Sequence, residues 1–223
     1  MEQVEGIKFP SMPGFNINEA TDILLKRDFD KYREIGEPHP FLVAKGRDFL
    51  IPFSHEHFEL WTQSLHFGAK DRLNFVDPKT NLKVGGGLDD VWLNINTNCL
   101  HIVDYKSTSQ KSDKGPITLD DPWKASYKRQ MDLYVWVLRK KGFHVDDVGY
   151  FLYCDGDRFS DYDFLSSTTA SMNFKITLID YKTNDTWIEP TLQDISECLN
   201  ERKRPQHSDY CEYGKFLTQS LNQ

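Results

Sequence analysis

The chain has 223 residues, of which 39% are hydrophobic and 13% aromatic, enough for one good-sized domain with a real core. Its formal net charge of −7 argues against a protein that coats nucleic acid non-specifically, but not against an enzyme that grips nucleic acid locally. No apolar run is of membrane-spanning length, and the first residues show no signal-peptide pattern. The four cysteines have no paired spacing. We therefore expect reduced thiols in a cytoplasmic protein without membrane partners.

Apolar spacing and turn residues predict helices and strands in an alternating order. Asn96, Thr97 and Asn98 separate two strand-like runs and are typical of a hairpin connection. The predicted elements, in chain order, are a helix over 18–35, a helix over 55–66, strand-like runs over 82–95 and 99–108, a long helix over about 122–141, strands over 149–154 and 173–180, a helix near 190–202 and a shorter one from about 213.

This order indicates an α/β fold with a central mixed β-sheet flanked by helices. No stretch rich in Pro, Gly or Ser marks a second domain, so we expect one domain over 1–223. Its core would span about 55–180, with the helix at 18–35 and the helices within 190–221 packed on it. The polar connection over 107–121 is long for a compact domain, and such loops are usually functional or mobile.

The run IVDYKST, residues 102–108, places an acid and a lysine on one face of a strand that is otherwise apolar. Side chains alternate along a strand, so Asp104 and Lys106 share a face. Through the predicted hairpin, either Asp89 or Asp90 lies beside Asp104. Two neighbouring carboxylates repel unless a cation lies between them, and Mg²⁺ accepts few protein carboxylates together with water and substrate phosphate. Lys106 would then polarise a water or neutralise developing phosphorane charge.

An Asp-x-Lys sequence alone is more often an ordinary salt bridge near a sheet edge, because so short a motif occurs by chance. Two neighbouring features favour a site. Gly85, Gly86 and Gly87 precede the acid pair, and glycine in a strand indicates close approach of a backbone or a ligand. In the long helix, Gln130 and Tyr134 form an i, i+4 pair on one face, which continues through Tyr127 and Trp123. The alternative for these aromatic residues is a place at the core boundary.

Positive charge is concentrated in the same region. Residues 106–141 contain nine basic and four acidic residues, whereas the whole chain is acidic. This distribution is what a channel that follows a phosphate backbone requires. The side chains that we expect to bind substrate are Lys111, Lys114, Trp123, Lys124, Tyr127 and Lys128.

Three motifs in this order resemble the PD-(D/E)XK nuclease superfamily: Gly-Gly-Leu-Asp over 86–89, Val-Asp-Tyr-Lys over 103–106, and Gln-x-x-x-Tyr over 130–134. The chain looks most like the RecB-like exonucleases and their CRISPR-associated relatives. The resemblance implies a restriction-endonuclease-like core, with Asp89 and Asp104 as ligands of Mg²⁺ or Mn²⁺. It also implies that Lys106 orients or activates the attacking water and that Gln130 and Tyr134 border the active site.

The branch often has a histidine that contacts the metal from an upstream helix. Here the resemblance offers His55, His57 and His66, of which we favour His55 at the start of its predicted helix. A capping or surface role is the alternative for each histidine. Iron–sulfur members of the branch have one early cysteine and three clustered near the end, but this chain keeps only Cys211 in its terminal segment. A four-thiolate cluster needs four placed sulfurs, so none is expected.

The sequence thus predicts a Mg²⁺- or Mn²⁺-dependent nuclease that acts on DNA, single-stranded DNA included, as an exonuclease in repair, recombination or defence, alone or with a helicase. A catalytically weak nucleic-acid-binding module of the same fold, serving as a scaffold in a larger complex, is the alternative. A metal-dependent hydrolase of small molecules would use the same acids but has less need of a basic loop and an aromatic stripe.

Overall fold

The computed structural model describes residues 16–62, 73–110, 115–201 and 206–221. The chain separates into two compact units. The first combines Met1–Phe75 with Val84–Asp185, and the second combines Val76–Lys83 with Thr186–Gln223.

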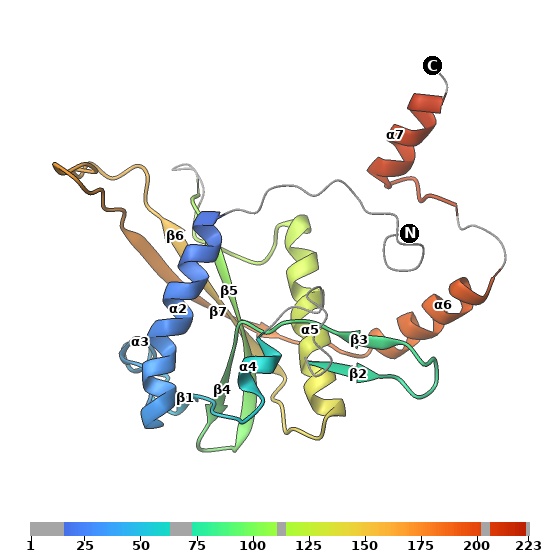
Figure 1. The fold of residues 1–223 in the computed structure, drawn as a ribbon, viewed down its shortest axis with the longest axis horizontal. Helices are drawn as coiled ribbons and strands as arrows, with labels where there is room; N and C mark the ends of the chain where they lie inside the picture. The colour runs from blue at the N-terminus through green and yellow to red at the C-terminus, as the bar shows by residue number, and fades with distance from the viewer. Residues whose placement is uncertain (1–15, 63–72, 111–114, 202–205, 222–223) are drawn as a thin grey trace. The chain divides into compact units, whose positions relative to one another are not determined.

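The first unit is built on a five-stranded sheet (Figure 1). The strand order is β1-β4-β5-β6-β7, in which β5 and β6 are parallel and the other neighbours are antiparallel. The prediction of a mixed sheet flanked by helices is confirmed. The strands are β1 (Leu50–Pro52), β4 (Asp90–Asn94), β5 (Cys99–Thr108), β6 (Val148–Gly156) and β7 (Phe174–Lys182).

Helices cover both faces of this sheet. On one face, Phe29 of α2 (Asn16–Ile35) packs with Trp92, Val103 and Tyr105 in a buried cluster. On the other face, α5 (Ala125–Lys140) packs so closely that a Cβ at Gly149 would lie 2.6 Å from the sulfur of Met131. The 3₁₀ turn η2 (Pro122–Lys124) leads into α5. Alternate residues of β5 therefore point to different helices, the odd-numbered ones to α2 and the even-numbered ones to α5.

The hairpin is present as predicted, with Asn94 of β4 paired to Cys99 of β5 and Asn98 at a φ of 56°. The run over 82–95 is not one strand, because four residues separate the end of β3 (Lys83–Gly85) from the start of β4. In these four residues, backbone amides form hydrogen bonds with other segments of the chain. Gly86 N donates to Leu73 O at 3.1 Å, and Leu88 N donates to Trp61 O at 2.8 Å. β3 pairs instead with β2 (Asn74–Val76) in a two-stranded sheet.

The sequence patterns did not predict three short elements, namely β1, β2 and the five-residue helix α3 (Pro40–Ala44). The helix predicted over 55–66 is described only as α4 (Phe58–Trp61), and residues 63–66 lie outside the described part of the chain. In the second unit, α6 (Ile188–Asn200) and α7 (Glu212–Leu221) match the two helices predicted at the end of the sequence. Lys79 pairs with Glu189 at 3.0 Å within this unit. None of the described helices is long and apolar enough to cross a membrane.

Candidate active site

Asp104 and Lys106 lie on the face of β5 that α5 covers. Asp104 is only 2% exposed, and its Oδ2 forms an ion pair with the Lys106 ammonium. The register pairs Asp90 with Val103 across β4 and β5, which puts the preceding residue, Asp89, at the level of Asp104. Asp89 is held there because its Oδ2 accepts a hydrogen bond from the backbone N of Tyr105 at 2.8 Å. The pleat and the hairpin register thus bring Asp89, Asp104 and Lys106 together.

Burial determines the electrostatics of this group. Loss of hydration raises the pKa of Asp104 to about 7, Lys106 opposes the rise, and the charge of Asp89 adds to it. The Oδ2 atom of Asp104 contacts an ammonium but accepts no properly directed hydrogen bond from the described residues. Lys106 itself lies over the ring of Tyr127, with 4.6 Å between Nζ and the ring centroid. The Oδ2 atom of this buried acid is therefore held by an ion pair with Lys106.

Asp90 has a different environment and belongs to the core. Its side chain is 1% exposed and lies on the α2 face of the sheet, with Val103 and Tyr105. Both oxygens are fully used by donors, namely Arg33 Nη2 at 2.5 Å, the backbone N of Val91 at 2.7 Å, Trp92 Nε1 at 3.1 Å and Tyr105 Oη at 2.7 Å. This arrangement leaves Asp89 as the neighbour of Asp104.

The N-terminal helix adds two charged residues that the sequence reading did not select. Burial raises the pKa of Asp22 to about 6, the charge of Asp89 adds to the rise, and Lys26 opposes it. Lys26 Nζ lies 4.0 Å from Asp89 Oδ1. The helix is docked there by a short hydrogen bond between the hydroxyls of Thr21 and Ser107, at the end of β5. The i, i+4 spacing of Asp22 and Lys26 was visible in the sequence, but the docking was not.

Tyr134 of the helix motif lies near enough to Asp104 and Asp89 for their charges to raise its pKa. Gln130 Nε2 donates to Tyr134 Oη at 2.9 Å, and burial raises the pKa of Tyr134 to about 12. Gly86 makes room for this tyrosine, since a Cβ there would lie 2.7 Å from Tyr134 Cε1. At Gly85 a Cβ would lie 2.1 Å from Leu73 O. Close approach of a ring and of a backbone thus accounts for the first two glycines of the run.

The comparison with protein families concerns most of the chain. Residues 29–215 match the model of the PD-(D/E)XK nuclease superfamily. The chain belongs to this superfamily. No curated protein and no solved structure is significantly similar to it. All three motifs lie within the match, whereas Asp22 and Lys26 precede it. Membership indicates a nuclease that acts on nucleic acid, and PD-(D/E)XK nucleases generally use Mg²⁺ or Mn²⁺.

The candidate third ligand of this nuclease site, His55, has other contacts for its ring. His55 and Asp89 both line a pocket of about 370 Å³. However, His55 Nδ1 accepts a hydrogen bond from His57 N at 3.1 Å. The His55 ring also stacks on Trp61, with 4.5 Å between the ring centroids. Within the described ranges, no three His, Cys, Asp or Glu side chains are placed to hold one metal ion. His57 is exposed, and His66 lies outside the described residues.

The residues expected to bind substrate differ in how exposed their side chains are. Trp123 is 56% exposed and packs edge-on against Tyr127, with 5.4 Å between ring centroids. Lys128 is half-exposed, and Lys111 and Lys114 lie outside the described residues. Lys124 is buried, with its Nζ bonded to Thr118 O at 2.5 Å and paired with Asp121. Its ammonium therefore faces the protein and not a solvent channel, which removes the support for a direct phosphate contact.

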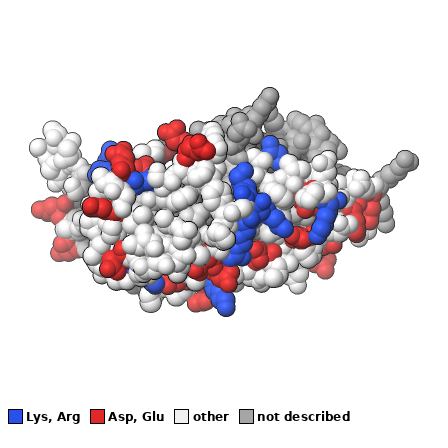
Figure 2. All heavy atoms as spheres, turned by 90° about the horizontal axis from the view of Figure 1, so that it is seen from below, with Lys and Arg blue, Asp and Glu red and all other residues white. Residues whose placement is uncertain are grey.

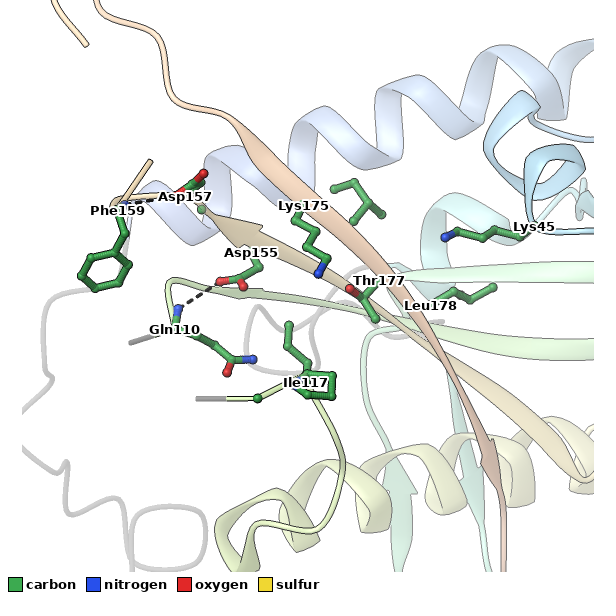
Figure 3. Close-up of a pocket in the computed structure, with 13 residues that line it drawn as sticks. Lys45, Gln110, Ile117, Asp155, Asp157, Phe159, Lys175, Thr177 and Leu178 are labelled. Atoms are coloured by element: carbon green, nitrogen blue, oxygen red, sulfur yellow. Dashed lines mark hydrogen bonds between the residues drawn. The ribbon is translucent and has the colours of Figure 1, made fainter. Parts of the chain in front are cut away.

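Basic side chains and a further pocket also occur away from the carboxylate pair. On the face shown in Figure 2, Lys and Arg side chains form separate groups interspersed with Asp and Glu. Figure 3 shows a pocket of about 770 Å³ that includes Asp155, whose Oδ1 accepts a hydrogen bond from Gln110 N at 3.0 Å. Neither Asp89 nor Asp104 lines that pocket. The carboxylate pair is thus a separate feature.

Proposed function

We propose that this protein is a Mg²⁺- or Mn²⁺-dependent deoxyribonuclease that hydrolyses phosphodiester bonds of DNA. It would act as a RecB-like exonuclease in repair, recombination or defence, with the whole chain forming one nuclease domain. The observation that carries the proposal is the convergence of Asp89, Asp104 and Lys106 on one face of the sheet. Superfamily membership supports the same reaction class.

The donor set suits a small hard cation. Mg²⁺ binds through one or two carboxylates and keeps water and substrate phosphate in its other positions. Asp89 and Asp104 supply two such carboxylates, and Asp89 lies close enough to raise the pKa of the buried Asp104. When bound, the metal would supply Lewis-acid stabilisation of the phosphoryl oxygens and a more acidic water. The fit thus rests on a carboxylate pair whose mutual repulsion the cation would relieve.

The protein groups have separable tasks. Lys106 is 15% exposed at its side chain and is held between Asp104 and the ring of Tyr127, so its ammonium has a fixed position. From there it can hold the attacking water and offset the negative charge that develops on phosphorus oxygens. Gln130 can accept a hydrogen bond from a metal-bound water through its amide oxygen, which is not used in the bond that its Nε2 donates to Tyr134. The second hydrogen of Nε2 can be donated to a phosphate oxygen.

One assay tests the proposal. Purified protein is incubated with labelled single- and double-stranded DNA and RNA in Mg²⁺, Mn²⁺ or EDTA. We expect metal-dependent cleavage of DNA that is lost in Asp104→Asn and Lys106→Ala. Lys175→Ala is the matched control, because this lysine lies on β7 of the same sheet and lines the separate pocket. Cleavage that persists in Lys106→Ala would refute the mechanism.

The other functions give different results in the same assay. Binding of nucleic acid without cleavage under any condition indicates the scaffold. Turnover of a small phosphoester alone indicates the small-molecule hydrolase. We also propose that the enzyme acts in the cytoplasm, alone or with a helicase or other repair or defence proteins. Its free cysteines support a reducing compartment.

A further inference from the structure

Tyr153 is a buried polar residue that the catalytic group does not use. It lies on β6 opposite Lys106 in the parallel register and therefore shares the face that carries Asp104. Its side chain is 2% exposed, and its hydroxyl has no hydrogen-bond partner in the described part of the chain. A buried hydroxyl without a partner is unfavourable, so such a group calls for an explanation. Burial also raises the pKa of Tyr153, which keeps the phenol protonated as a donor.

The hydroxyl belongs to a residue that lines a pocket of about 310 Å³. This volume is at the lower end of the range of roughly 300–1,000 Å³ for small-ligand pockets. The other lining residues come from the end of β5, the connection after it, η2 and the residue Arg158 just after β6. They are Thr108, Ser109, Gln110, Ile117, Asp121, Trp123, Lys124 and Arg158. None of them lies outside the described residues.

The pocket is lined by two aromatic residues, and the buried Lys124 ammonium lies near both of their rings. The Lys124 ammonium lies 5.2 Å from the Trp123 ring and 5.6 Å from the Tyr153 ring. It is paired with Asp121 at 3.1 Å and bonded to Thr118 O, so its charge is compensated. With the Lys124 charge compensated, the exposed Arg158 is the lining cation that can meet the phosphate of a bound nucleotide. The exposed face of Trp123, with a buried phenol hydroxyl in the same lining, suits a planar, polar ring system.

The pocket is adjacent to the catalytic lysine. The ring of Tyr127 lies beneath the Lys106 ammonium and also contacts the pocket residue Trp123 edge-on. A base held on Trp123 would therefore belong to a nucleotide near the phosphate on which Lys106 acts.

We propose that this pocket binds the nucleobase of a nucleotide next to the cleaved phosphodiester, stacked on Trp123 and hydrogen-bonded by the Tyr153 hydroxyl. The inference rests on the proposed nuclease function and specifies its substrate. A base can enter a pocket of this size only when it is unpaired and unstacked. The preferred substrate is therefore a single-stranded segment or a frayed end rather than a closed duplex.

Binding is tested apart from cleavage in a Lys106→Ala background with Mg²⁺. Short single-stranded oligonucleotides with 2-aminopurine at one position are titrated with protein, because stacking on an aromatic ring quenches this base. We expect quenching at one position along the strand. Adding Trp123→Ala should abolish it and weaken binding roughly 5- to 160-fold, from the usual range for base stacking. Adding Tyr153→Phe should weaken binding roughly 3- to 10-fold, as for one neutral hydrogen bond, without lowering the melting temperature.

Two matched controls should bind as the background does. Tyr150→Phe removes a hydroxyl from a buried tyrosine on the opposite face of β6. Phe164→Ala removes an aromatic ring with the same 56% exposure as Trp123, outside the pocket. Unchanged quenching and affinity in both Trp123→Ala and Tyr153→Phe would overturn the inference. So would equal binding of blunt duplex and single strand.

The failure of the pocket and the failure of the nuclease are distinguishable. If the wild type cleaves DNA with metal while the pocket variants bind and cleave normally, the nuclease stands and the base pocket is wrong. If the pocket variants lose binding while the wild type cleaves no nucleic acid, the pocket stands and the catalytic proposal is wrong.

Discussion

Asp89 and Asp90 are adjacent in the sequence, yet their replacement by asparagine should have opposite effects. All four hydrogen-bond partners of the buried Asp90 carboxylate are donors. In Asp90→Asn, the new amide nitrogen is also a donor, so it would face donors and lose their hydrogen bonds. Removing one partner of a buried ion pair costs about 3–5 kcal/mol. Arg33 keeps its contact with Asp30 at 2.9 Å, so we expect about 3 kcal/mol, the lower end. For a unit of this size, that lowers the melting temperature by roughly 6–12 °C.

Asp89→Asn should leave folding almost unchanged and abolish cleavage. The side chain of Asp89 is 24% exposed, and an asparagine oxygen can still accept from Tyr105 N. We expect a loss of less than about 1 kcal/mol, as for a partly exposed hydrogen bond. The measurements are urea unfolding and metal-dependent cleavage for both variants. If Asp90→Asn unfolds like the wild type, or Asp89→Asn is the more destabilised variant, the assignment of the two acids is wrong.

Three further predictions concern the same site. Gly86→Ala should lower the free energy of unfolding by about 1–3 kcal/mol, because the added methyl group overpacks against Tyr134. Adding Tyr134→Leu should recover part of this loss. Equal stability of the single and double variants in urea would contradict the prediction. Without metal, the wild type should lose stability as the pH rises from about 4 to 7, because folded Asp104, with its pKa near 7, holds a proton that the unfolded chain has released; thermal scans should show a smaller slope in Asp104→Asn. Adding Mg²⁺ should raise the melting temperature of the wild type by mass action but not that of Asp104→Asn, and an equal rise in both would exclude Asp104 as a ligand.

Local patterns in the sequence were sufficient to place most of the sheet. The period-2 alternation around Asp104 predicted the shared face with Lys106, and the Asn-Thr-Asn connection predicted the pairing of β4 with β5. The long helix was expected over 122–141 and occupies residues 122–140, counting its 3₁₀ turn. These features depend on neighbours in the chain, and a single sequence contains that information.

The sequence could not predict features that depend on distant contacts. The break between β3 and β4 is set by bonds from Gly86 and Leu88 to residues 73 and 61, and no local pattern encodes them. The place of Asp22 depends on how α2 docks on the end of β5. Lys124 belongs to a basic run, but its direction is fixed by Thr118 and Asp121. A lysine in such a run therefore says little about which way its ammonium points.

One residue shows why the carboxylate site and the core cannot be separated. Tyr105 donates from its backbone N to Asp89 and from its hydroxyl to Asp90. The hydroxyl is buried, and Asp90 is also fixed by Arg33, so the position of the strand is set from the α2 side. That position then sets where Asp89 lies relative to Asp104. The buried Arg33–Asp90 pair therefore acts on the position of Asp89 through Tyr105.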